Sequence, residues 1–293
     1  HEYGASVCGQ CTLSEADKVA LPDWAELTLD GNPTSRTCLA NPALYDLLAK
    51  RLEVIKQRRL TADSQAVVGV YLESEPSMGA WLEVEELGGN PHTVALFQQW
   101  LSEKYPSLEA FSEAAGQPFT NWEAILPSDA NWLVQVWMHR FRPWLTQVHY
   151  QGQLAARVKA EMPDLPLVSR WVDAAGFSPR YDTDWSYWPE VPVDVCGITC
   201  YPQESTFLGS VAMETSFASA YGRPGALTEF GKKRGERFFT PTPEEVRCVI
   251  WRALSEPVSL WTLFSWAIPG DTGGCSLYRS EEHTSELQSR QVI

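Results

Sequence analysis

The chain has 293 residues, of which 44% are hydrophobic and 20% charged, a balance typical of a globular protein rather than a disordered or fibrous one. Acidic residues outnumber basic ones by 37 to 23, and the formal net charge of −14 disfavours nucleic acids and anionic membrane surfaces as partners. The uncharged stretch 257–270 is shorter than the ~18 residues of a membrane-spanning helix. The 13 tryptophans are many for this length, and indole rings suit the C–H faces of sugars as well as a protein core.

Two kinds of segment alternate along the chain. Apolar residues at helical spacing predict helices at about 42–59, 93–105, 131–162, 206–221 and 243–254. We expect Asn41 to cap the first of these helices and Pro143 to kink or break the third. Short β-rich runs predict strands at 66–72, 167–172, 195–200, 226–228 and 259–266, with room for one more before residue 10. Because strands that alternate with helices form parallel sheets, we expect a single α/β domain.

An alternating chain of this kind forms either a doubly wound sheet or an eight-stranded barrel. No Gly-x-Gly-x-x-Gly motif follows a predicted strand, which disfavours a dinucleotide-binding sheet. In a barrel, catalytic groups stand at the carboxyl ends of strands, where Glu73, Glu75 and Glu229 are found. Two carboxylates on opposite walls of a sugar-sized cleft are what glycoside hydrolysis requires. Because the chain has 37 acidic residues, spacing alone does not single out this pair.

Around these carboxylates the sequence resembles a known enzyme family. VVGVYLESEPSMGAW resembles the fourth-strand signature of the retaining clan of barrel glycosidases, and residues 97–127 and 21–48 resemble segments of glycoside hydrolase family 42, the β-galactosidases. The resemblance, from about residue 21 to 270, implies a (β/α)8 TIM barrel that is N-terminally incomplete, with about strands 3 or 4 to 8 present. It also implies cleavage of β-linked galactosides by double displacement without a cofactor, with Glu75 as acid/base and Glu229 as nucleophile.

The resemblance further implies a set of substrate-binding residues at strand ends. Tyr201 follows one strand, Trp266 ends the last one in the position of a sugar-subsite floor, and Arg170 and Trp171 end the strand at 167–172. Ser74 stands where the family has an asparagine that contacts the sugar 2-hydroxyl, which implies a weaker contact, a different substrate geometry or a decayed site. Residues 79–92 lack the cysteines of the family's zinc loop, so we expect no metal there.

Other functions stay open at this point. One is a related glycosidase acting on plant polysaccharide, of the β-mannanase or cellulase type, and another is a carbohydrate-binding protein that has lost catalysis. Carbohydrate is the expected partner in each case, whereas the sequence decides neither the compartment nor whether the full-length protein forms a homo-oligomer. Cys8, Cys11 and Cys38 are compatible with a disulfide between Cys8 and either of the others, with a zinc site, or with buried thiols.

The two ends of the chain carry their own expectations. The string RSEEHTSELQS at 279–289 resembles a translated DNA-sequencing adapter, so we expect a partial catalytic domain at 1–278 and a non-native tail at 279–293. Only about 65 residues precede the presumed fourth barrel strand, too few for three βα units of ~30 residues each. We therefore expect the first barrel strands to lie upstream, and residues 1–278 expressed alone to be insoluble or inactive because open strand edges pair with other chains.

Overall fold

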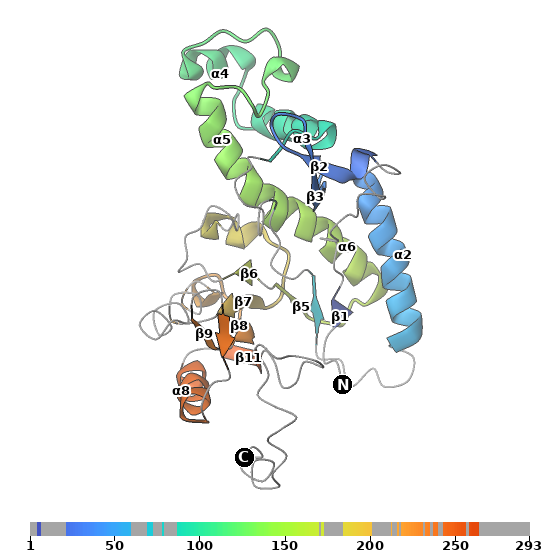
Figure 1. Cartoon of the computed structure of the whole chain (residues 1–293), viewed down its shortest axis with the longest axis vertical. Coiled ribbons are helices and arrows are strands. Elements are labelled where there is room, and N and C mark those ends of the chain that lie inside the picture. The colour runs from blue at the N-terminus through green and yellow to red at the C-terminus, as the bar shows by residue number, and fades with distance from the viewer. Residues whose placement is uncertain are drawn as a thin grey trace. The chain divides into compact units, whose positions relative to one another are not determined.

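The computed structural model describes residues 5–6, 22–59, 69–72, 78, 87–169, 171–172, 184–200, 212, 216, 218–230, 232–234, 237–239, 243–255 and 258–263 (Figure 1). The chain divides into two compact units. The first comprises residues 1–169 and 177–194, and the second comprises residues 170–176 and 195–293. Each unit contains its own parallel sheet. The other described strands form two antiparallel hairpins, and the described strands do not show a closed barrel.

The sheet of the first unit has the strand order β1-β4-β5, with β1 at Ala5–Ser6, β4 at Val70–Tyr71 and β5 at Leu167–Val168. All three strands are parallel. The extra strand expected before residue 10 is therefore present as β1, and β4 occupies the end of the strand predicted at 66–72. Gly69 directly precedes β4, close to the residue before β5. A Cβ at position 69 would lie 3.2 Å from the carbonyl oxygen of Pro166, so a larger residue would require a shift of a few tenths of an ångström there.

A hairpin and a long helix follow β1 in the chain. After the short 3₁₀ helix η1 (Pro22–Trp24), β2 (Ala25–Leu27) pairs antiparallel with β3 (Pro33–Thr37). Its turn contains Gly31, whose φ of 84° is a conformation that glycine adopts without strain. Helix α2 runs from Pro42 to Arg59 as predicted, and the Asn41 side chain caps it by accepting a hydrogen bond from the Ala43 N–H at 3.0 Å.

Most of the described part of the first unit is helical, and side chains define where its helices begin. Helix α3 spans Pro91–Ser102, α4 spans Leu108–Ala115 and α5 spans Trp132–Pro143. Asn90, Ser107 and Asn131 each accept a hydrogen bond from a backbone N–H of the first turn that follows. Helix α3 thus starts two residues before the predicted position 93, because Asn90 caps it and Pro91 suits its first turn. The 3₁₀ helix η3 (Trp122–Ala124) lies between α4 and α5 in sequence.

Pro143 does not break its helix. Helix α5 continues into a π-helical segment, η4 (Trp144–Tyr150), and then into α6 (Gln151–Glu161), and the three follow one path in Figure 1. Proline has no N–H to donate to the preceding turn, and a π segment accommodates the interruption without ending the helix. The Thr146 hydroxyl lies 3.2 Å from each of the Arg142 and Pro143 carbonyl oxygens, to which it donates. Helix α2 packs against α6.

Aromatic rings form the core of this helical region. Trp100 is 2% exposed, and its ring lies 5.5 Å from those of Trp137 and Phe141 and 5.7 Å from that of Trp144. Further ring contacts join Tyr105, Phe111, Phe119 and Trp122 to the same cluster. Most of the tryptophan enrichment in the described part of this unit therefore serves packing. The 3₁₀ helix η7 (Trp185–Glu190) contributes another buried indole, Trp188, and contacts η4.

The second unit contains a four-stranded parallel sheet with the order β11-β8-β7-β6. Its strands are β6 (Trp171–Val172), β7 (Cys196–Cys200), β8 (Gly225–Phe230) and β11 (Val258–Leu263). The hairpin β9–β10 (Lys232–Arg234 and Arg237–Phe239) was not predicted, whereas α8 (Pro243–Leu254) has the predicted bounds. Of the helix predicted at 206–221, residues 212, 216 and 218–220 are described and are helical. No helix among the described residues is long and apolar enough to cross a membrane.

Candidate active site

The carboxyl edge of the second unit's sheet holds the predicted nucleophile, Glu229. Glu229 lies inside β8, one residue before the strand ends, and its backbone pairs with Thr199 of β7. Because the four strands are parallel, their carboxyl ends meet at one edge of the sheet, the edge at which open α/β sheets carry their ligand-binding groups. The backbone therefore places Glu229 at the edge where a catalytic carboxylate was expected.

Strand β8 is irregular next to Glu229. Ile198 of β7 pairs with Leu227, and the following residue, Thr199, pairs with Glu229, so β8 has one residue more than its neighbour here. On the other side Trp261 and Leu263 of β11 pair with Leu227 and Phe230, which again gives β8 one extra residue. Such bulges change the direction of the side chains that follow and are common next to active sites. Sequence reasoning missed this feature, and no local signal in the segment GALTEF would have revealed it.

Trp171 is the other predicted site residue whose backbone is described. It begins β6, and its backbone pairs with Ile198 of β7, which pairs in turn with Leu227 of β8. Trp171 therefore lies one residue nearer the amino ends of the strands than the pair formed by Thr199 and Glu229. Glu75, Ser74, Arg170, Tyr201 and Trp266 lie outside the described residues. Their roles stay predictions, as does the expected spacing between the two catalytic carboxyl groups.

The described residues contain one deeply buried carboxyl group that sequence reasoning did not single out, Glu26 of β2, which is 1% exposed. Its carboxylate accepts hydrogen bonds from the Thr93 hydroxyl at 2.7 Å and from the Asn90 N–H at 3.2 Å. Burial raises the pKa of Glu26, while these hydrogen bonds lower it. The group ties the β2–β3 hairpin to the first turn of α3, and its full set of partners indicates a structural role rather than a catalytic one.

Cys38 borders this buried group. Its sulfur lies 3.3 Å from the Thr93 hydroxyl, and burial raises the pKa of its thiol well above the usual range. Cys38 is a free thiol in the structure, which contradicts the alternative of a Cys8–Cys38 disulfide. Cys8 and Cys11 lie outside the described residues. Within the described part of the chain, no three His, Cys, Asp or Glu side chains gather as metal ligands.

Solved structures resemble the chain over most of its length. A β-galactosidase from the Antarctic haloarchaeon Halorubrum lacusprofundi superposes with a TM-score of 0.70 at 16% identity, over 90% of this chain and 42% of that one. A catalytic mutant of a GH42 β-galactosidase from G. stearothermophilus gives a TM-score of 0.74 at 13% identity, over 96% and 44%. The catalytic domain of a β-amylase from Paenibacillus polymyxa gives 0.65 at 12%, over 89% and 75%.

The chain shares the fold of these glycoside hydrolases. The resemblance to the family 42 β-galactosidases noted in the sequence is thereby confirmed at the level of the fold. The chain spans less than half the length of the β-galactosidases it matches, which is compatible with a partial barrel. No protein-family model and no curated protein sequence matches it.

Proposed function

We propose that the chain is the catalytic part of a retaining glycoside hydrolase that cleaves β-linked galactosides. The observation that carries the proposal is the position of Glu229 at the carboxyl edge of the parallel sheet β6–β7–β8–β11, in a chain whose fold resembles β-galactosidases over 90% of its length. In barrel enzymes this edge carries the catalytic groups, whereas residues at the opposite edge serve stability.

In this proposal Glu229 attacks the anomeric carbon while Glu75 protonates the departing glycosidic oxygen. A covalent glycosyl-enzyme forms, and Glu75, now ionised, takes a proton from the water that releases the sugar. Glu75 must therefore have a raised pKa, as a carboxyl group in an apolar pocket has, while Glu229 remains ionised. We expect the two carboxyl groups to lie about 5–5.5 Å apart, the separation typical of retention.

The remaining predicted residues would bind the sugar around this pair. Trp266 would form the floor of the subsite, with Tyr201, Arg170 and Trp171 at neighbouring strand ends, and Ser74 would replace the amide that contacts the 2-hydroxyl. If the serine reflects a decayed site, Ser74→Asn should raise turnover by restoring that contact. If the pocket is adapted to another substrate, the same substitution should lower turnover.

The test is chemical rescue, done on the protein in the longest natural form that its gene encodes. Glu229→Ala should abolish hydrolysis of a nitrophenyl β-galactoside. Added azide should restore the release of nitrophenol with an α-galactosyl azide as the product, because azide occupies the space left by the carboxylate and attacks the anomeric carbon in its place. Glu75→Ala with azide should give the β-galactosyl azide, because the glycosyl-enzyme still forms on Glu229. Undiminished hydrolysis by Glu229→Ala would contradict the proposal.

A second candidate substrate is a polysaccharide. It is favoured by the likeness to the β-amylase catalytic domain and to an agarase, the latter with a TM-score of 0.55. Parallel assays on galactosides and on β-linked oligosaccharides of increasing length separate the two. Turnover that rises with each added sugar unit indicates an extended groove, while turnover independent of length indicates a pocket for one terminal sugar.

A further inference from the structure

Positive charge is concentrated in the hairpin β9–β10 of the second unit. Residues 232–239 read KKRGERFF and carry four cations against one carboxylate, in a chain whose net charge is −14. The pairing of Arg234 with Arg237 leaves only Gly235 and Glu236 between the two strands, and glycine followed by another residue is typical of two-residue hairpin turns. A local sequence pattern therefore gathers these cations in one place.

The register of the hairpin places three of the four cations on one face. Successive residues of a strand belong to opposite faces, and residues that pair directly across two strands share a face. Lys233 and its partner Phe238 therefore lie on one face of the hairpin. The other face holds Lys232, Arg234, Arg237 and Phe239.

Two of these cations are paired directly across the hairpin. Arg234 and Arg237 form the pair nearest the turn, and the Cβ atoms of directly opposed residues are typically about 4.5–5.5 Å apart. Like charges in that arrangement destabilise a hairpin, so an anion bound beside both arginines would stabilise this one. A guanidinium presents its N–H donors in a planar fork that matches carboxylates and phosphates, and a sulfate ester has the same tetrahedral oxygens as a phosphate.

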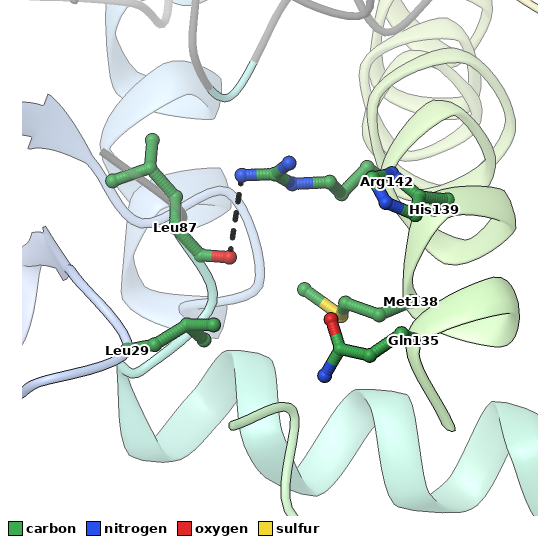
Figure 2. A pocket seen from close by; sticks show the side chains of 6 residues that line it. All are labelled: Leu29, Leu87, Gln135, Met138, His139 and Arg142. Carbon is green, nitrogen blue, oxygen red and sulfur yellow. Dashed lines mark hydrogen bonds between the residues drawn. The ribbon is translucent and has the colours of Figure 1, made fainter. Parts of the chain in front are cut away.

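Several cations elsewhere in the described chain lie singly beside their own partners. The Lys159 ammonium group lies 2.9 Å from the Asp194 carboxylate. Arg142 donates to the Leu87 carbonyl oxygen at 3.5 Å, beside a hollow with room for about one water molecule (Figure 2). The hairpin is different, because its register sets like charges next to each other.

The hairpin starts close to the candidate nucleophile. Lys232 is three residues after Glu229, and a chain spans at most about 3.6 Å per residue, so their Cα atoms lie within about 11 Å of each other. Both residues belong to the second unit, and the hairpin follows β8 at the carboxyl edge of the sheet, where barrel enzymes carry the loops that shape the substrate site. A substrate bound at Glu229 can therefore reach the hairpin.

We propose that the hairpin binds anionic groups on the galactose units of the substrate, either sulfate esters or carboxylates, so that the protein prefers a charged galactan to a neutral one. The three cations of one face suit the anion, and Phe239 on the same face suits the apolar side of the sugar ring that carries it. Because the chain as a whole is acidic and repels polyanions, the preference is confined to this edge. The inference rests on the proposed function, since it takes the galactoside bound at Glu229 as the carrier of the anion.

Three oligosaccharides with one carbon skeleton test the proposal on the protein in its longest natural form. A κ-carrageenan oligosaccharide is a galactan with sulfate esters, its desulfated form is neutral, and oxidation of the desulfated form at carbon 6 introduces carboxylates. We expect calorimetry at low salt to show that a charged form binds about tenfold or more tightly than the neutral one, and that 1 M sodium chloride reduces the difference. The charged form that binds more tightly identifies the anionic group.

Variants on the two faces of the hairpin assign the binding. Arg237→Gln should lower the ratio of charged-form to neutral-form affinity by about tenfold, because one guanidinium contact to the anion is lost. Lys233→Gln removes the same charge from the opposite face and should change this ratio little. Circular dichroism confirms that both variants are folded. Because the measure is a ratio, a general loss of sugar binding does not imitate the effect.

Four results would overturn the proposal: a ratio of one for the unaltered protein, no binding of either charged form, equal effects of Arg237→Gln and Lys233→Gln, or equally tight binding of a DNA oligonucleotide, which would indicate a general polyanion site. The proposed function fails separately. A ratio of one together with an inactive Glu229→Ala variant overturns only this inference, whereas undiminished hydrolysis by Glu229→Ala contradicts the proposed function whatever the ratio is.

Discussion

The helix ends within residues 90–161 of the first unit and the sheet of the second unit are determined by contacts of different range in sequence. In the helical region, a cap and the turn that it serves are neighbours in sequence, as with Asn131 and the Leu133 N–H. The rings packed on Trp100, by contrast, belong to residues 37 to 44 positions later in the chain, Trp137, Phe141 and Trp144. In the sheet, Glu229 takes its position from Thr199, which is thirty residues earlier in the chain. The ends of these helices are thus encoded locally, whereas the ring packing and the position of the candidate nucleophile depend on residues that are distant in sequence.

Among the substitutions that test this comparison, Trp100→Ala should lower the unfolding free energy most. The substitution empties the centre of the ring cluster and removes the packing partner of the Lys104 ammonium group, which lies 4.8 Å from the indole centroid. Replacing a buried aromatic residue by alanine typically costs about 3–5 kcal/mol of unfolding free energy. Urea unfolding measures the loss, and Leu126→Ala, at a side chain that is 47% exposed, is the control and should change little. Equal losses from both variants would contradict an aromatic core.

Asn131→Ala should have a smaller effect, about 1–2 kcal/mol. The side chain caps α5 through the Leu133 N–H at 3.0 Å, and its amide also donates to the carbonyl oxygen of Ala115 at 3.1 Å, which joins the end of α4 to the start of α5. Asn131→Asp keeps the capping oxygen but loses the donor, so it should lie between alanine and the unaltered chain. A melting series of the three proteins checks the order.

Glu26→Gln should change how stability depends on pH. Burial raises the pKa of Glu26 above its ordinary value, so the native state holds this proton more tightly than the unfolded state. The free energy of unfolding therefore falls as pH rises from the unfolded pKa through the folded one, and the glutamine variant should lack this fall. Glu109→Gln is a control of opposite sign, because hydrogen bonds to its own backbone and to Ser107 lower the pKa of Glu109. Urea unfolding from pH 2 to pH 8 gives both slopes, because the Glu109 window lies below the ordinary pKa of 4.5 and the Glu26 window lies above it.

The smallest expected effect is that of Lys56→Ala. Its ammonium group lies 2.6 Å from the Glu161 carboxylate, which joins α2 to α6, but each side chain is 46% exposed. Exposed ion pairs contribute about 0.2–1 kcal/mol and are screened by salt. The loss should disappear in 1 M sodium chloride, and a loss that persists there would indicate packing by the aliphatic stem instead.

The sequence predicted the elements whose determinants are local. Helices α2 and α8 have their predicted bounds, and Asn41 caps α2, because proline and a capping side chain mark those ends. The strand predicted at 226–228 is present but extends to Phe230, which places Glu229 inside it. The bulge beside Glu229 was not predictable, because it arises from two neighbouring strands that no local pattern specifies.

The burial of Glu26 and the continuity of the helix past Pro143 were also hard to predict, because no local sequence pattern specifies either of them. Glu26 occupies a polar position in a short hairpin, and its burial depends on Thr93, 67 residues later in the chain. Pro143 predicted a kink or a break, and the structure shows no break, because the π segment η4 follows Pro143 and continues into α6. Glu75, the tail at 279–293 and the insolubility of residues 1–278 stay predictions.

The π-helical segment η4 also sets the phase between α5 and α6. A π turn closes its hydrogen bonds one residue further along than an α turn, so it accommodates one extra residue while the faces of the flanking helices stay aligned. Deleting one residue between Leu145 and Tyr150 should therefore convert the π turn into an α turn, whereas a deletion at the start of α6 would rotate the rest of that helix by about 100° and shift it by about 1.5 Å. The buried side chains of Leu154, Ala155 and Val158 would then leave their partners. The π segment is therefore the part of this helical path in which the loss of one residue should be tolerated best.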